Sequence, residues 1–201
     1  MKQFIIRPNH FLKRPTQAFY RLAYVGFEKP DNPDFLNHLK NQYGMSPHRQ
    51  LQEAAAQAQR VLAADLPKIP KLVGVSPLTV CVVPRAWAER SYSSDQLLFR
   101  ESVRLVAHNS TNLVDGTTFI KRHTDTKTTH LRKKPDLRGA APYPGITCET
   151  CHLSIHIRGR DILLVDDIYT LGVNVDEDAI QALYDAGARS VTFYAVARTG
   201  G

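Results

Sequence analysis

Residues 161–174 read DILLVDDIYTLGVN, and this stretch decides the expected fold. Ile162 to Val165 form an unbroken apolar run, which is typical of a strand buried on both faces in a parallel sheet flanked by helices. Asp166 and Asp167 follow at once, where we expect the strand to leave the sheet. Because open α/β sheets bind ligands at the carboxyl ends of their parallel strands, the two acids predict a ligand site.

A polar, glycine-containing loop from Thr170 to Asn174 comes next, and then a helix. We expect Asn174 to cap this helix together with Glu177, and Gly187 to end it. Loop amides and a helix N-terminus favour a phosphate, while carboxylates accept hydrogen bonds from sugar hydroxyls. The unit therefore indicates a phosphorylated sugar as ligand. The alternative is an ordinary strand-loop-helix connection whose acids only cap and solubilise.

Leu163 to Asn174 resembles the signature of type I phosphoribosyltransferases, which is a hydrophobic run, Asp-Asp and then Thr-Thr-Gly-x-Thr. The signature binds phosphoribosyl pyrophosphate (PRPP). The resemblance implies that the two acids are catalytic and hold the ribose 2- and 3-hydroxyls, and that the loop wraps the 5-phosphate. Leu171 stands where the second Thr is usual, and Asn174 where the final Thr or Ser is usual. The PRPP-binding residues so implied are Asp166, Asp167, Ile168, Tyr169, Thr170, Leu171, Gly172, Val173 and Asn174.

Leu78 to Val83 is a second candidate for a buried strand, and Pro84-Arg85-Ala86 follows it. In the family, the loop after the first core strand binds pyrophosphate, so the resemblance assigns Arg85 and Ala86 to that role. Residues 90–96, RSYSSDQ, are similar to the Arg-Gly-Phe-Asn-Gln region of ComF-like members, which together with amidophosphoribosyltransferase-like members are the nearest in pattern. The alternative for Arg85 is a solvated loop arginine.

Lys121 to Arg138 holds seven Lys or Arg against two Asp and has no apolar periodicity, so we expect a basic loop. The resemblance implies that this loop closes over pyrophosphate, with Lys127, or else Arg132 or Lys133, as its cation. A solvated loop and a nucleic-acid patch are the alternatives. The loop contains no aromatic residue for base stacking, which disfavours a single-strand binder.

Cys148 and Cys151 have the spacing of zinc ligands, and His130, His152 or His156 would complete a set. The same segment equally suits a strand with half-buried thiols.

The net charge of +7 over 201 residues favours an anionic partner. No apolar run approaches the ~20 residues of a membrane span, and the N-terminus lacks a secretory signal, so we expect a cytoplasmic protein without a membrane partner. Three cysteines fit a reducing compartment.

The expected fold is α/β and similar to type I phosphoribosyltransferases, with a mostly parallel core sheet flanked by helices. Residues 77–201 would form this core, with strands near 78, 117 (Thr117 to Ile120), 161 and 190. Residues 1–76 would form an N-terminal helical extension, and a possible hood over the acceptor. Within it we expect a short strand at Lys2 to Arg7, and helices at Asp34 to Tyr43 and from Ser46-Pro47 to about Ala64.

The function so implied is PRPP-dependent phosphoribosyl transfer, in which an unidentified nitrogen nucleophile displaces pyrophosphate at the anomeric carbon. Mg²⁺ would be held by PRPP oxygens, because it prefers few protein ligands and many waters. The alternative is a non-catalytic subunit that binds PRPP or a nucleotide, with its basic loop on nucleic acid. Members of the family often dimerise, which leaves a homodimer open.

Overall fold

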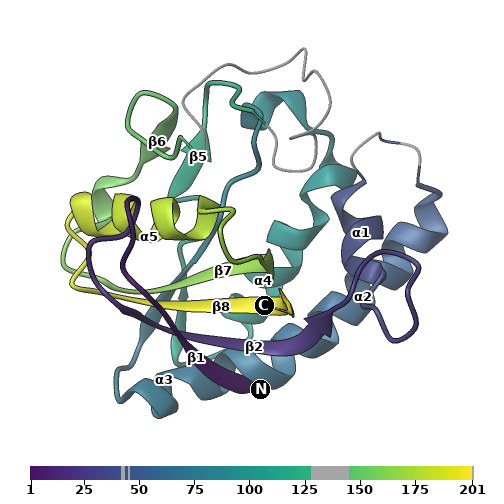
Figure 1. Ribbon diagram of the computed structural model, residues 1–201, viewed down its shortest axis with the longest axis horizontal. Helices are drawn as coiled ribbons and strands as arrows, with labels where there is room; N and C mark the ends of the chain where they lie inside the picture. Colours follow the sequence, from purple (N-terminus) through teal and green to yellow (C-terminus); the bar gives the residue numbers. More distant parts are fainter. Residues whose placement is uncertain (42–43, 45, 128–144, 201) are drawn as a thin grey trace.

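The computed structural model describes residues 1–41, 44, 46–127 and 145–200. Its main element is a six-stranded sheet in the order β1-β2-β8-β7-β3-β4 (Figure 1). β1 is antiparallel to β2, and the remaining pairs are all parallel. The predicted α/β class with a mostly parallel sheet flanked by helices is therefore confirmed. The strands are β1 (Lys2–Ile6), β2 (Thr16–Tyr24), β3 (Leu78–Val82), β4 (Leu113–Asp115), β7 (Asp161–Tyr169) and β8 (Ser190–Thr199).

β7 lies between β3 and β8 and is buried on both faces, as its apolar run predicts. Ile162 and Leu164 belong to one core cluster, and Leu163 and Val165 to the other. Successive side chains of a strand point to opposite faces, so an uninterrupted apolar run fills both cores.

Helices cover both faces of the sheet (Figure 1). The core that includes Leu163 is filled by residues of α1 (Phe35–Lys40), α2 (His48–Asp65) and α4 (Leu98–His108). The core that includes Leu164 is filled mainly by α5 (Val175–Asp185) and by residues near a two-stranded sheet. The remaining elements are α3 (Ile69–Val73), β5 (Ile120–Arg122), β6 (Cys151–Leu153) and the 3-10 turns η1 (Leu66–Lys68), η2 (Glu89–Ser91), η3 (Ser94–Leu97) and η4 (Ile155–Ile157).

The N-terminal residues are more than the expected helical extension, because they also supply β1 and β2 to the sheet. β2 pairs in parallel with β8, a pairing that the sequence analysis did not foresee. A buried carboxylate holds the segment in place. Asp65, at the end of α2, accepts hydrogen bonds from Arg21 Nε on β2 and from the Tyr194 hydroxyl on β8, each at 2.9 Å.

The strand expected at Thr117 to Ile120 is wrong. The sheet strand is β4, which pairs with β3 and ends at Asp115. Asp115 Oδ1 accepts hydrogen bonds from the Thr117 amide at 2.9 Å and hydroxyl at 2.7 Å, which turns the chain out of the sheet. Gly116 allows this turn because it has no Cβ. A Cβ at this position would lie 2.7 Å from Thr79 Cγ2, which is too close for two carbon atoms. Ile120–Arg122 instead pairs antiparallel with Cys151–Leu153.

No helix in the described part of the chain is long and apolar enough to cross a bilayer.

Candidate functional site

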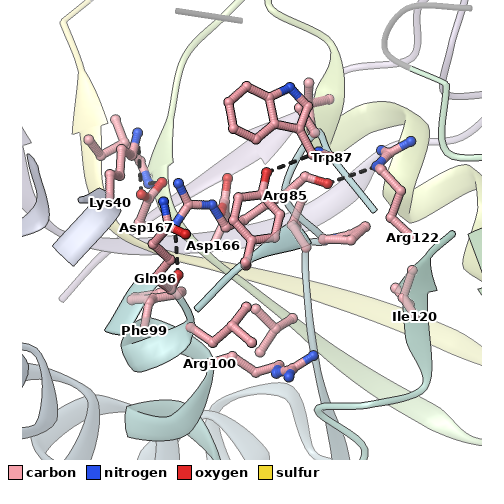
Figure 2. A pocket seen from close by; sticks show the side chains of 18 of the residues that line it. Lys40, Arg85, Trp87, Gln96, Phe99, Arg100, Ile120, Arg122, Asp166 and Asp167 are labelled. Atoms are coloured by element: carbon pink, nitrogen blue, oxygen red, sulfur yellow. Dashed lines mark hydrogen bonds and ion pairs between the residues drawn. The ribbon is translucent and has the colours of Figure 1, made fainter. Parts of the chain in front are cut away.

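A cavity of about 390 Å³ lies at the carboxyl ends of β3 and β7. Its walls come from the chain after β3, the end of β7 with the loop that follows, the C-terminal end of α1 and the start of α4 (Figure 2). The N-terminal segment and the core therefore enclose one site together.

Asp166 and Asp167, the two acids of the expected ligand site, both line this cavity. The expected end of the strand at Val165 is too early, because β7 continues to Tyr169. β8 extends the pairing, with Asp166 opposite Ala195. The acids are thus held by a strand and not by a flexible loop, and Asp167 Oδ1 also accepts a hydrogen bond from its neighbour, the Ile168 amide, at 2.7 Å.

Lys40, the last residue of α1, reaches the acid pair. Its Nζ lies 3.2 Å from Asp167 Oδ2, and the two side chains are 20% and 17% exposed. Asn41 follows in a left-handed conformation with φ of 37°. Gln96 Nε2 donates to the Asn41 carbonyl at 3.0 Å, and the Ser46 amide donates to Asn41 Oδ1 at 3.1 Å. These contacts fix the end of α1 and hold Lys40 beside Asp167. The positive charge of Lys40 therefore offsets the negative charge of that acid.

Asp176, in the first turn of α5, lines the same cavity, and its carboxyl is hydrogen-bonded to that of Asp166. Burial and the neighbouring Asp167 charge raise the pKa of Asp166 to about 7. Burial and the Asp166 charge raise the pKa of Asp176 well above its ordinary value. Two carboxylates hold only acceptors, so this hydrogen bond requires a proton on one of them. At neutral pH, Asp166, Asp167 and Asp176 together therefore carry less negative charge than three ionised carboxylates would.

Three arginines, Arg85, Arg100 and Arg122, line the same cavity (Figure 2). Arg85 Nη1 donates to the Gln96 carbonyl at 2.6 Å, and the guanidinium lies 4.4 Å from the centre of the Tyr92 ring. Arg122 is 4% exposed and donates from Nε to the Arg85 carbonyl at 2.8 Å. Burial lowers its pKa, and within the described residues it forms no ion pair with a carboxylate. Arg122 Nη1 also donates to the Gly145 carbonyl at 2.8 Å, so carbonyl oxygens satisfy these donors while no carboxylate of the described chain pairs with the positive charge, which favours an anionic ligand.

The other two residues assigned to pyrophosphate, Ala86 and Lys127, also line the cavity. The Ala86 carbonyl accepts hydrogen bonds from the Thr126 amide at 2.8 Å and hydroxyl at 2.9 Å, which ties the chain before Lys127 to the segment after β3. His130, Arg132 and Lys133 lie outside the described residues, as does most of the expected basic loop.

The loop after β7 is only partly turned toward the cavity. Ile168, Thr170 and Val173 line the cavity, whereas Tyr169, Leu171, Gly172 and Asn174 do not. Tyr169 is buried in the core beneath α5, and Leu171 is 66% exposed.

The capping box expected at Asn174 and Glu177 is wrong. Asn174 is left-handed, with φ of 66°, and makes no side-chain cap. Its Nδ2 donates to the Gly172 carbonyl at 3.2 Å, and its Oδ1 accepts from Asn9 Nδ2 at 3.1 Å. Glu177 instead accepts a hydrogen bond from the Tyr169 hydroxyl at 2.9 Å. The side chain of Asn174 thus holds the loop to the β1–β2 connection.

Cys148 is exposed and Cys151 is buried. Cys151 begins β6 opposite Arg122, and burial raises the pKa of its thiol. Among the residues that the structure describes, no three His, Cys, Asp or Glu side chains are grouped to hold a metal ion.

Neither the family models nor the curated proteins compared with this chain give a match.

Sequence reasoning missed several polar residues of the site, and Lys40, Arg122 and Asp176 are the ones that bear on its charge. Each lies in a stretch that was assigned another role: Lys40 in the hood, Arg122 in the basic loop and Asp176 among acids near a phosphate. Lys40 at the end of an expected helix and Asp176 ten residues after Asp166 carry no local signal of their own. Only their meeting at one cavity distinguishes them.

Proposed function

We propose that this chain is a PRPP-dependent phosphoribosyltransferase of the type I fold, in which a nitrogen nucleophile displaces pyrophosphate at the ribose anomeric carbon. One observation carries the proposal: carboxylates and arginines together line a single cavity at the carboxyl ends of parallel strands. Sugar hydroxyls need hydrogen-bond acceptors, and pyrophosphate needs cations and amides. A ligand that has both sugar hydroxyls and a pyrophosphate therefore suits a cavity lined by both acids and arginines.

In this proposal Asp166 and Asp167 accept hydrogen bonds from the ribose hydroxyls, while Arg85, Arg122 and Lys127 receive the pyrophosphate. A volume of about 390 Å³ falls within the usual range for small-ligand sites. Catalysis would be chiefly electrostatic, with the acids supporting a positively charged ribose and the arginines supporting the leaving pyrophosphate.

Mg²⁺ fits this site as a companion of PRPP more than as a resident metal. Mg²⁺ readily keeps ligand phosphate oxygens and water, so PRPP itself can supply most of its ligands. When bound, it would neutralise pyrophosphate charge.

The double substitution Asp166→Asn with Asp167→Asn tests the proposal. Each carboxylate should accept charge-assisted hydrogen bonds worth about 1.5 to 3 kcal/mol, so the double variant should lose PRPP binding in calorimetry with Mg²⁺. Asp185→Asn, at the exposed far end of α5, is the matched control and should bind like the wild type. Equal PRPP affinity in the wild type and the double variant would reject the ribose assignment.

A second candidate is a non-catalytic PRPP or nucleotide binder. Leu171 is exposed where the family places a hydroxyl, and the Asn174 side chain is already hydrogen-bonded within the protein, so the loop offers fewer side-chain donors to a phosphate. Binding of PRPP without release of pyrophosphate, in the presence of ammonium as a simple nitrogen nucleophile, would favour the binder. Release would favour the enzyme.

A further inference from the structure

Asp176 has no role in the expected PRPP signature, yet it contacts the acid that does. It lies on α5 and Asp166 on β7, and both line the cavity. Asp176 is 4% exposed, and its Oδ1 has no hydrogen-bond partner. An ionised carboxylate in such a place would be strongly destabilised, so Asp176 is better accommodated as a neutral acid that donates a hydrogen bond to Asp166.

The charged neighbours support the same division of roles. Asp167 pairs with Lys40 and accepts a hydrogen bond from the Ile168 amide. Glu177, 1% exposed, accepts from the Tyr169 hydroxyl, and its charge adds to the repulsion that keeps Asp176 protonated. Burial raises the pKa of Tyr169, so its hydroxyl remains a donor. Asp166 is the group left able to gain or lose a proton near neutral pH.

We propose that Asp176, held as a neutral carboxylic acid beside Asp166, is a positioning residue that keeps Asp166 oriented to take the proton lost by the nitrogen nucleophile. This inference rests on the proposed transfer reaction. The bond between the anomeric carbon and pyrophosphate breaks, and its electron pair leaves with pyrophosphate. The nitrogen lone pair forms the new bond to that carbon, and the proton from the nitrogen moves to Asp166. The raised pKa of Asp166 suits a base working near neutral pH.

The first test needs no ligand. Carboxyl carbon NMR on the wild-type protein should show Asp166 titrating near pH 7. The Asp176 hydrogen bond lowers the pKa of Asp166, so Asp176→Ala should move this titration upward by about one to two units, the size of one hydrogen bond to a charged group. Asp176→Asn, whose amide still donates, should restore it. Titration of Asp166 with the ordinary carboxyls, or an unmoved titration in Asp176→Ala, overturns the proposal.

The second test measures pyrophosphate release from PRPP with Mg²⁺ as a function of pH, with ammonium chloride adjusted at each pH so that the concentration of free ammonia, the nucleophile, stays constant. The acid limb of the rate should shift upward in Asp176→Ala by the same amount as the NMR titration and return in Asp176→Asn, with Asp185→Asn as the unchanged control. A variant that is merely less stable would lower the rate at every pH and leave the limb in place, which contradicts a positioning role. Absence of release at every pH in the wild type would reject both the transfer reaction and the base role, while the NMR titration would still report the shared proton separately.

Discussion

Replacement of Asp65 by Ala should reveal whether residues 1–76 fold as one unit with the rest of the sheet. Asp65 is fully buried at the end of α2 and accepts hydrogen bonds from Arg21 on β2 and Tyr194 on β8. It is thus the polar link between a helix and two strands. Removing one partner of a buried ion pair costs about 3 to 5 kcal/mol, because the other charge is left unpaired. The Arg21 side chain is 34% exposed and can reach water, so we expect the lower end, about 3 kcal/mol.

Urea unfolding followed by both helical circular dichroism and Trp87 fluorescence is the appropriate assay. A loss of about 3 kcal/mol is a large share of the roughly 5 to 15 kcal/mol that stabilises a typical domain, so the midpoint should fall clearly. Glu53→Ala is the matched control on the same helix. It removes a surface ion pair with Arg49, whose side chain is 90% exposed, and should change stability by less than about 1 kcal/mol.

Two results would refute this reasoning. A loss below about 1 kcal/mol for Asp65→Ala would mean that the buried ion pair does not hold α2 to the sheet. Separate midpoints for the helical signal and for Trp87, which lies just after β3, would mean that the N-terminal segment unfolds independently.

Three further variants test the site and its support. Lys40→Met adds one net negative charge to the cavity and should weaken binding of anionic PRPP about tenfold or more by calorimetry; unchanged affinity would show that the ion pair has no part in binding. Leu171→Thr with Asn174→Thr restores two hydroxyl donors at the loop and should tighten PRPP binding about tenfold, whereas flat or weaker binding would withdraw the 5-phosphate assignment. Hydrogen bonds from Arg189 lower the pKa of Asp161 below its ordinary value of 3.8, so the stability that it contributes is present above about pH 4 and is lost as the pH falls further. Asp161→Asn should therefore flatten the acid fall of Tm, and an equally steep fall would contradict this.

Local pattern was enough for the centre of the fold. The apolar run in β7, the acids after it and the helical spacing of α5 all depend on neighbours within about twenty residues, and so do the strands β3 and β8. A run of four apolar residues such as Ile162 to Val165 has few alternatives to burial on both faces, which is why that burial was predictable. The acid pair was predictable for the same reason, because it directly follows that run.

Other features of the fold and the site depend on residues that are far apart in the chain and could not be predicted from local pattern. β2 carries Arg21 in its middle, which argues against a buried strand until Asp65 and Tyr194 are brought beside it. Asn174 begins a helix in a sequence that suggests a cap, but Asn9 holds its side chain elsewhere.

Charge was the least predictable property of the site. From sequence alone, Asp166 and Asp167 are two ionised acids near a phosphate loop. In the structure, Lys40 offsets one of them, and Asp176 shares a hydrogen bond with the other. The free energy of a buried charge depends on the groups within a few ångströms of it. Tertiary packing determines which groups these are, and position along the chain does not.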